Sequence, residues 1–145
     1  MVTGGDVRQT EGMESRRRYP HISQEDHIMG NPVVHFEVRV NDESRQPAFY
    51  EQLFGWKLGG EDPLLNYRMV DTQSDAGIQG GMLPTRPGLT PGLTVYAQVD
   101  DLPTALDRAQ SLGASTVVPP TKLPGPGSFA VIADPEGYQV GLIQF

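Results

Sequence analysis

The chain has 145 residues, enough for one domain with a substantial core and too few for two large ones. Its 18 acidic and 11 basic residues give a net charge of −7, which repels phosphate backbones and anionic membrane surfaces, so we expect neither nucleic acid nor a membrane as a partner. Because there is no cysteine, disulfide scaffolds, thiol catalysis and cysteine-bound zinc are excluded.

The first 30 residues are polar, carry both charges and show neither a strand nor a helix period. They predict a disordered tail, residues 1–30, ahead of a folded domain at residues 31–145. No apolar run approaches the roughly 20 residues that cross a bilayer, and the apolar centre of a secretory signal is missing. We therefore expect a cytoplasmic protein.

The first half of the domain reads as a strand, a helix and further strands. "VVHFEVRV", residues 33–40, alternates apolar and polar side chains as a half-buried strand does. In the helix that follows, residues 41–44 supply capping side chains, Pro47 suits the first turn, Phe49 and Leu53 share a face, and Gly55 closes the end. The aromatic residues Phe49, Tyr50, Phe54 and Trp56 are expected to belong to the core on this helix face. "YRMVD" and "GIQGGML", residues 67–71 and 77–83, predict strands separated by turns.

The second half repeats this order. "LTVYAQV", starting at Leu93, predicts a strand, and the following helix has an aspartate cap, Pro103 in its first turn and Gly113 at its end. Three strand patterns complete this half: "STVVPP", "SFAVIAD" and "YQVGLIQF".

Equivalent positions in the two halves keep a nearly constant separation. Val40 and Val99 lie 59 positions apart, and Gly77 and Gly137 lie 60 apart. The chain is therefore predicted to be a duplicated βαβββ unit, with modules at about residues 31–86 and 91–145. Two copies are too few for a solenoid, so we expect them to pair around a shared sheet in an α+β fold.

Four segments in this order resemble the vicinal oxygen chelate superfamily, which includes glyoxalase I, bleomycin-resistance proteins and extradiol dioxygenases. The segments are "HFEVRVND", "AFYEQLFGW", "VDDLPTALDRAQSLGA" and "FAVIADPEGYQVGL". The resemblance implies a curled mixed sheet with a central cup, helices outside and a ligand inside. It also implies a homodimer, and whether one chain or two build the cup is left open.

Catalytic members hold a divalent metal with side chains from the first and fourth strands of each module. His35 matches the first of these positions, whereas the other three carry Thr94, Gly81 and Gly141. Glycine has no side-chain donor and threonine is a poor ligand, whereas a catalytic site needs about three protein ligands. We therefore expect no resident metal and no cofactor, and His35 is the one candidate metal ligand.

Alternation along the strands predicts which side chains share the cup face with His35, while apolar residues such as Val38 and Val95 face the helices. Amides, a carboxylate, a guanidinium and a phenol among apolar residues suit a small-molecule pocket. Gly81, Gly141 and Ile143 lie on the same face. The predicted ligand-binding residues are His35, Glu37, Arg39, Gln79, Thr94, Tyr96, Gln98 and Gln139.

Two functional hypotheses follow, with assembly alone as a third. The first is a protein that binds a small organic molecule in the cup without metal, as bleomycin-resistance members do. The alternative is a lyase, isomerase or dioxygenase in which His35 is the candidate catalytic residue. It would be metal-free, with His35 as base and Tyr96 or Arg39 as electrophile, or metal-dependent, with His35, Glu37 and a glutamine as ligands.

Overall fold

The computed structural model describes residues 30–63 and 66–145. Residues Asn31–Phe145 form one compact unit. The predicted N-terminal tail lies, except for Gly30, outside the described residues. Among the residues described, no helix is long and apolar enough to span a membrane.

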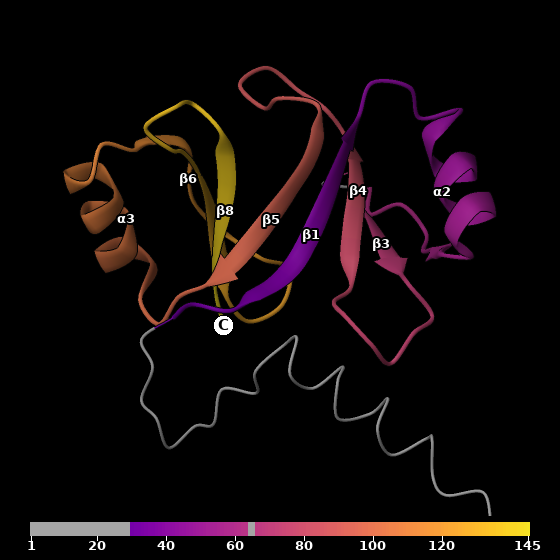
Figure 1. Ribbon diagram of the computed structural model, residues 1–145, viewed down its shortest axis with the longest axis horizontal. Helices are drawn as coiled ribbons and strands as arrows, with labels where there is room; N and C mark the ends of the chain where they lie inside the picture. Colours follow the sequence, from indigo (N-terminus) through magenta and orange to yellow (C-terminus); the bar gives the residue numbers. More distant parts are fainter. Residues whose placement is uncertain (1–29, 64–65) are drawn as a thin grey trace, which may run out of the picture. The chain divides into compact units, whose positions relative to one another are not determined.

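Each half of the unit is a βαβββ module, as predicted, and all eight strands form one curled mixed sheet with the helices outside it (Figure 1). The strand order is β2-β3-β4-β1-β5-β8-β7-β6, so the first strands of the two modules meet at the centre. The first module consists of β1 (Val33–Val40), α2 (Gln46–Phe54), β2 (Lys57–Leu58), β3 (Arg68–Asp71) and β4 (Gly80–Pro84). The second consists of β5 (Gly92–Gln98), α3 (Leu102–Ser111), β6 (Ser115–Lys122), β7 (Ser128–Ala133) and β8 (Gln139–Gln144).

The strand register is the same in both modules. β1 and β5 pair antiparallel, and each of them pairs parallel with the fourth strand of its own module. Adding 59 or 60 to the residue numbers of a strand pair in the first module gives the equivalent pair in the second. The halves are therefore related by an approximate two-fold axis between β1 and β5. One chain thus builds the whole sheet. The central pairs are His35 with Tyr96, Glu37 with Thr94, Glu37 with Gly81, and Tyr96 with Gly141.

The apolar side chains of the sheet form two separate cores on the outer face, one under each helix. In the second module Leu102 and Leu106 of α3 pack with Ala130, Ile132 and Leu142. The core of the first module consists of Val38, Val40, Val70 and Met82, with Tyr50 and Trp56 packed against it. Each module therefore buries its own apolar surface, and the two are joined through the polar centre of the sheet.

The two helices are anchored differently. Asp101 caps α3 by accepting the backbone N–H of Thr104, and two leucines of α3 are buried. Helix α2 has no side-chain cap and no buried residue. Its ring contact with the core is made by Tyr50, which stacks on Trp56 at 5.5 Å between centroids. Glu51 adds a polar contact by accepting the backbone N–H of Leu58 in β2 at 3.2 Å.

Three of the core assignments made from the sequence are wrong. Phe49 and Phe54, expected to belong to the core face of α2, are 53% and 54% exposed, and Leu53 on the same helix is 59% exposed. Val95 was expected to pack against a helix and is 43% exposed. It lies on β5 in the middle of the sheet, between the two helices (Figure 1).

The difference between the helices predicts different costs for the same substitution. Leu106→Ala should lower the free energy of unfolding by about 2 to 5 kcal/mol, because it opens a cavity in the α3 core. Leu53→Ala, the matched control on α2, should change it by less than about 0.5 kcal/mol. Urea unfolding of both variants measures the difference, and equal costs would contradict this account of α2.

Candidate functional site

The face of the sheet opposite the helices carries a buried polar cluster at its centre. Glu37, Arg39, Thr94 and Tyr96 are only 2% to 5% exposed, and all belong to the two central strands. The alternation of β1 that places Val38 and Val40 in the outer core places His35, Glu37 and Arg39 on this inner face. Burying a carboxylate and a guanidinium is costly unless they are paired, so the cluster depends on its internal contacts.

An ion pair forms the centre of the cluster. Arg39 Nε donates to Glu37 Oε1 at 2.9 Å, and the Tyr96 hydroxyl donates to Glu37 Oε2 at 3.0 Å. The side chains of Arg39 and Glu37 are 0% and 6% exposed. Both carboxylate oxygens are therefore occupied, one by a residue of each module.

Gln139 extends this network to the segment that connects the modules. Its Oε1 accepts from Arg39 Nη1 at 2.6 Å and from the backbone N–H of Thr90 at 3.1 Å, while its Nε2 donates to the carbonyl oxygen of Gly88 at 2.8 Å. Arg39 Nη2 is buried and has no hydrogen-bond partner among the described residues. The ion pair thus ties β1, β5, β8 and the connecting segment together.

His35 contacts a residue that the sequence did not single out. Its Nε2 lies 2.6 Å from the hydroxyl of Tyr67, which immediately precedes β3, and both side chains are partly buried. Burial lowers the pKa of His35 and outweighs the opposing effect of the Glu37 charge. Burial, reinforced by the Glu37 charge, raises the pKa of Tyr67. A neutral imidazole and a protonated phenol are favoured, and these two forms are joined by one hydrogen bond.

Two glycines make room for the tyrosines of the inner face. A Cβ at Gly81 would overlap the hydroxyl end of Tyr67, and a Cβ at Gly141 would overlap the ring of Tyr96. Each tyrosine therefore lies directly against the backbone of a fourth strand. Only glycine permits this approach, and any larger residue at either position would displace the ring.

The structure brings six of the eight predicted site residues to this centre and leaves two apart. Gln79 is exposed in the segment before β4, where its Oε1 accepts the backbone N–H of Thr72 at 2.7 Å. Gln98 ends β5, and its backbone groups bond to Asn31 and Pro32. The sequence signal for Tyr67 was the alternation of "YRMVD", which puts Tyr67 and Met69 on the inner face. The eight predicted site residues, by contrast, all come from the predicted first and fourth strands of the modules.

The donor set of this centre does not fit a catalytic metal. Residues 30–63 and 66–145 contain no group of three or more His, Asp or Glu side chains placed to hold a metal ion. Nε2 of His35 faces the Tyr67 hydroxyl, and both oxygens of Glu37 already accept hydrogen bonds. A carboxylate or imidazole at positions 81 and 141 would complete such a set, but glycines stand there under tyrosine rings.

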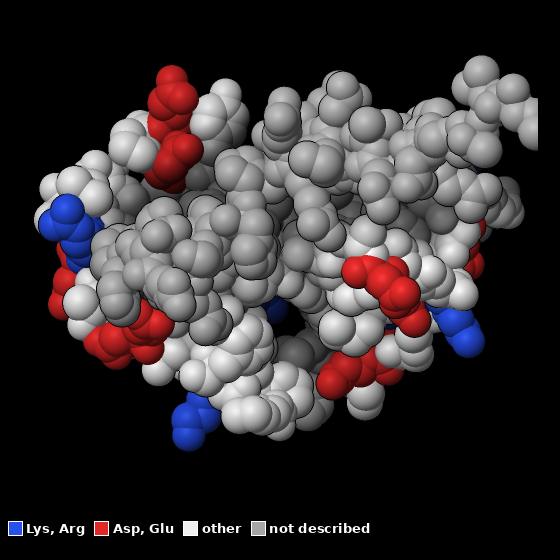
Figure 2. All heavy atoms as spheres, turned by 60° about the horizontal axis from the view of Figure 1, so that its bottom comes forward, with Lys and Arg blue, Asp and Glu red and all other residues white. Residues whose placement is uncertain are grey.

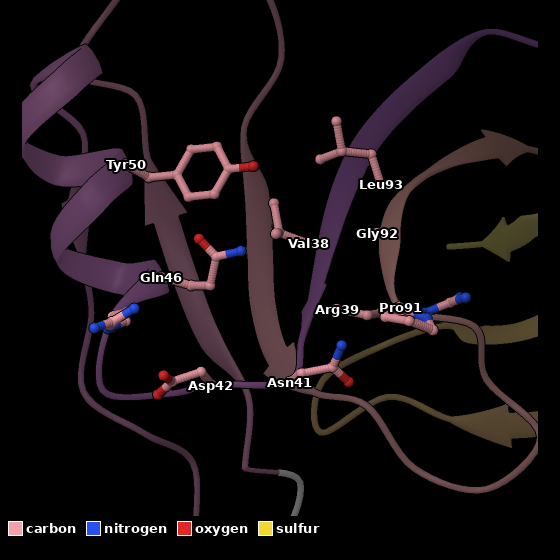
Figure 3. A pocket seen from close by; sticks show the side chains of 10 residues that line it. Val38, Arg39, Asn41, Asp42, Gln46, Tyr50, Pro91, Gly92 and Leu93 are labelled. Carbon is pink, nitrogen blue, oxygen red and sulfur yellow. The ribbon is translucent and has the colours of Figure 1, made fainter.

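A separate hollow of about 420 Å³ lies on the outer side of the sheet, between α2 and the start of β5. Gln46 and Tyr50 of α2 point across it toward Val38 and Leu93 on the strands (Figure 3). The inner-face cluster has no part in this hollow beyond Arg39, whose side chain extends away from it in Figure 3. The hollow lies beside α2, a helix with no buried residue.

Comparisons with known proteins point to one family. The model of the Glyoxalase/Bleomycin resistance protein/Dioxygenase superfamily matches residues 32–142. Curated proteins of Mycobacterium bovis and Mycobacterium tuberculosis, each named "Putative glyoxylase CFP32", are 34% identical over 92 residues, which is 62% of this chain and 35% of theirs. The aligned part thus spans about a third of the curated relatives' length.

Solved structures share the fold at low sequence identity. A member of the same superfamily from Vibrio splendidus 12B01 superimposes with a TM-score of 0.57 at 15% identity, over 80% of this chain and 100% of that one. The Mn(II)-bound glyoxalase from Novosphingobium aromaticivorans gives a TM-score of 0.58 at 15% identity, over 86% of this chain and 40% of that one. At such identities these structures show the architecture alone.

The buried ion pair predicts a large cost for removing one charge. Glu37→Gln should lower the free energy of unfolding by about 3 to 5 kcal/mol, because Arg39 would remain charged and buried without its counter-ion. The exposed control Glu136→Gln should cost less than about 0.5 kcal/mol. The double variant Glu37→Gln/Arg39→Met should recover part of the loss in denaturant unfolding, and no recovery would contradict the pairing.

The lowered pKa of His35 predicts a specific pH dependence of stability. Because the folded state favours the neutral imidazole, the free energy of unfolding should fall as the pH drops below the ordinary value of 6.5 toward the lower folded-state pKa. Unfolding at pH 5.5 and 7.5 should show a smaller difference for His35→Gln than for the native chain. An NMR-measured pKa of 6.5 or higher for His35 would refute the burial argument.

Proposed function

This chain belongs to the Glyoxalase/Bleomycin resistance protein/Dioxygenase superfamily, and from that premise we propose that it binds a small organic molecule on the inner face of its sheet without a divalent metal. The observation that carries the proposal is the placement of Tyr67 and Tyr96 over Gly81 and Gly141. Those two glycines occupy the fourth-strand positions where the family resemblance implies metal ligands. Ring atoms fill the space that a coordinating side chain would need.

The strand register supports this assignment of positions. His35 and Thr94 occupy equivalent positions in the two modules, as do Gly81 and Gly141. Residues that lie 59 or 60 positions apart form the same strand pairs in both modules. Of the four positions, only His35 has a strong donor atom. That atom faces a hydroxyl at 2.6 Å. Fewer than three ligands remain, which is below what a catalytic zinc-type site requires.

Binding is favoured over catalysis because the polar groups of the cluster are already paired with one another. A general base needs a lone pair within reach of the substrate. Nε2 of His35 is paired with the hydroxyl of Tyr67 at 2.6 Å. Glu37 is likewise engaged by Arg39 and Tyr96. The hydrogen bonds among these groups stabilise the centre of the sheet. Groups at the border of the cluster can form hydrogen bonds with a bound molecule.

Mass spectrometry of protein purified without an affinity tag tests the proposal. Under native conditions we expect a retained organic molecule of a few hundred daltons or less, released on denaturation, and elemental analysis should find less than about 0.1 divalent ion per chain. Addition of Zn²⁺, Ni²⁺, Mn²⁺ or a chelator should leave the midpoint of thermal unfolding unchanged, because the folded chain would have no metal site whose occupation stabilises it.

The contrary result is equally specific. A stoichiometric divalent ion that disappears in His35→Ala and persists in the control Gln79→Ala would overturn the metal-free proposal and favour the metal-dependent enzyme instead. Gln79 is a suitable control because it lies exposed, away from the buried cluster, and contacts only a backbone amide.

A further inference from the structure

The rings of His35 and Tyr67 form one nearly flat surface. Their planes differ by 22° and their centroids lie 6.3 Å apart, while Nε2 and the hydroxyl oxygen are 2.6 Å apart. A contact that short between the edges of two rings, at that separation of the centres, means that the rings lie end to end in a common plane and not face upon face. We call this pair of rings the His35–Tyr67 platform.

The platform crosses the inner face of the first module. His35 belongs to β1, and the hydroxyl end of Tyr67 lies against Gly81 of β4. Both rings are only partly buried, so part of the platform is open to the cup. Met69, which pairs with Gly81 and is 55% exposed, stands beside it on the same face. Thioether sulfur and aromatic faces attract one another, so Met69 suits the same kind of occupant.

Tyr96 supports the platform from the neighbouring strand. Its ring is inclined at 72° to that of His35, with centroids 5.7 Å apart, and Phe129 follows in a second edge contact at 6.4 Å. Because Tyr96 is only 5% exposed, its ring fixes the position of His35. The flat, partly exposed platform matches a planar molecule better than a globular aliphatic one.

The platform carries no net charge. Glu37 and Arg39 form an ion pair with each other, and burial lowers the pKa of His35 so that its neutral form is favoured. On the surface seen in Figure 2, the acidic and basic side chains of the described residues lie in small scattered groups. An uncharged aromatic ring therefore suits the neutral rings of the platform.

We infer that the molecule bound at this site carries an uncharged planar aromatic ring, which stacks on the His35–Tyr67 platform. This inference rests on the proposed binding function and adds the chemical class of the ligand. Stacking on such a surface is worth roughly threefold to tenfold in affinity beyond burial of the same area.

Matched pairs of probes test the inference by isothermal titration calorimetry. The first pair is 2-naphthol and decahydro-2-naphthol, and the second is acetophenone and cyclohexyl methyl ketone. Each pair shares a carbon skeleton and an oxygen group and differs in aromaticity. The aromatic member should bind the native chain about threefold to tenfold more tightly than its saturated partner.

Three variants locate that preference. Tyr67→Leu and His35→Leu each remove one half of the platform and should reduce the ratio of the two affinities to about one. Tyr138→Leu makes the same change at a tyrosine that is 70% exposed in the turn before β8, and it should leave the ratio unchanged. Circular dichroism identifies variants that are folded, and the two platform variants provide independent tests.

The remaining outcomes separate this inference from the proposed function. Equal binding of aromatic and saturated partners, or a preference that survives in both platform variants, would overturn the aromatic assignment and leave small-molecule binding intact. Failure of the native chain to bind any of the four probes, together with no retained molecule in native mass spectrometry, would overturn both.

Discussion

The buried pair of Glu37 and Arg39 is the constraint on which the rest of the inner face depends. Two charges at the centre of a sheet lose their hydration, and close ionic and hydrogen-bonding partners are needed to offset that loss. Tyr96 comes from the second module and Gln139 from its last strand. The same contacts that satisfy the charges therefore join the two halves, whose apolar cores are separate.

The same constraint shows how the inner face is organised. Hydrogen bonds to both oxygens of Glu37 hold its centre. Gly81 and Gly141 bring two phenol rings against the backbone of the fourth strands. The inner face is therefore built from rings and hydroxyl groups around one buried ion pair.

The approximate two-fold symmetry is kept in the backbone and broken in the side chains. His35 is equivalent to Thr94, and Glu37 to Tyr96, so equivalent positions carry different functional groups in the two halves. The hydroxyl paired with His35 comes from Tyr67 of the same module, whereas the one that binds Glu37 comes from Tyr96 of the other module. The helices differ too, since α3 has a side-chain cap and two buried leucines and α2 has neither a cap nor a buried residue.

The sequence by itself determined the duplicated βαβββ order, the polar and apolar faces of β1 and β5, and the glycines at the fourth-strand positions, because periodicity and spacing are local properties that survive without coordinates. Only the tertiary structure decided that Tyr67 meets His35, that Gln79 lies outside the cluster, and that Phe49 and Leu53 remain exposed. Those outcomes depend on the register of β3 against β4 and on how α2 packs on the sheet. Both are set by contacts between elements, which the periodicity of a single segment does not encode.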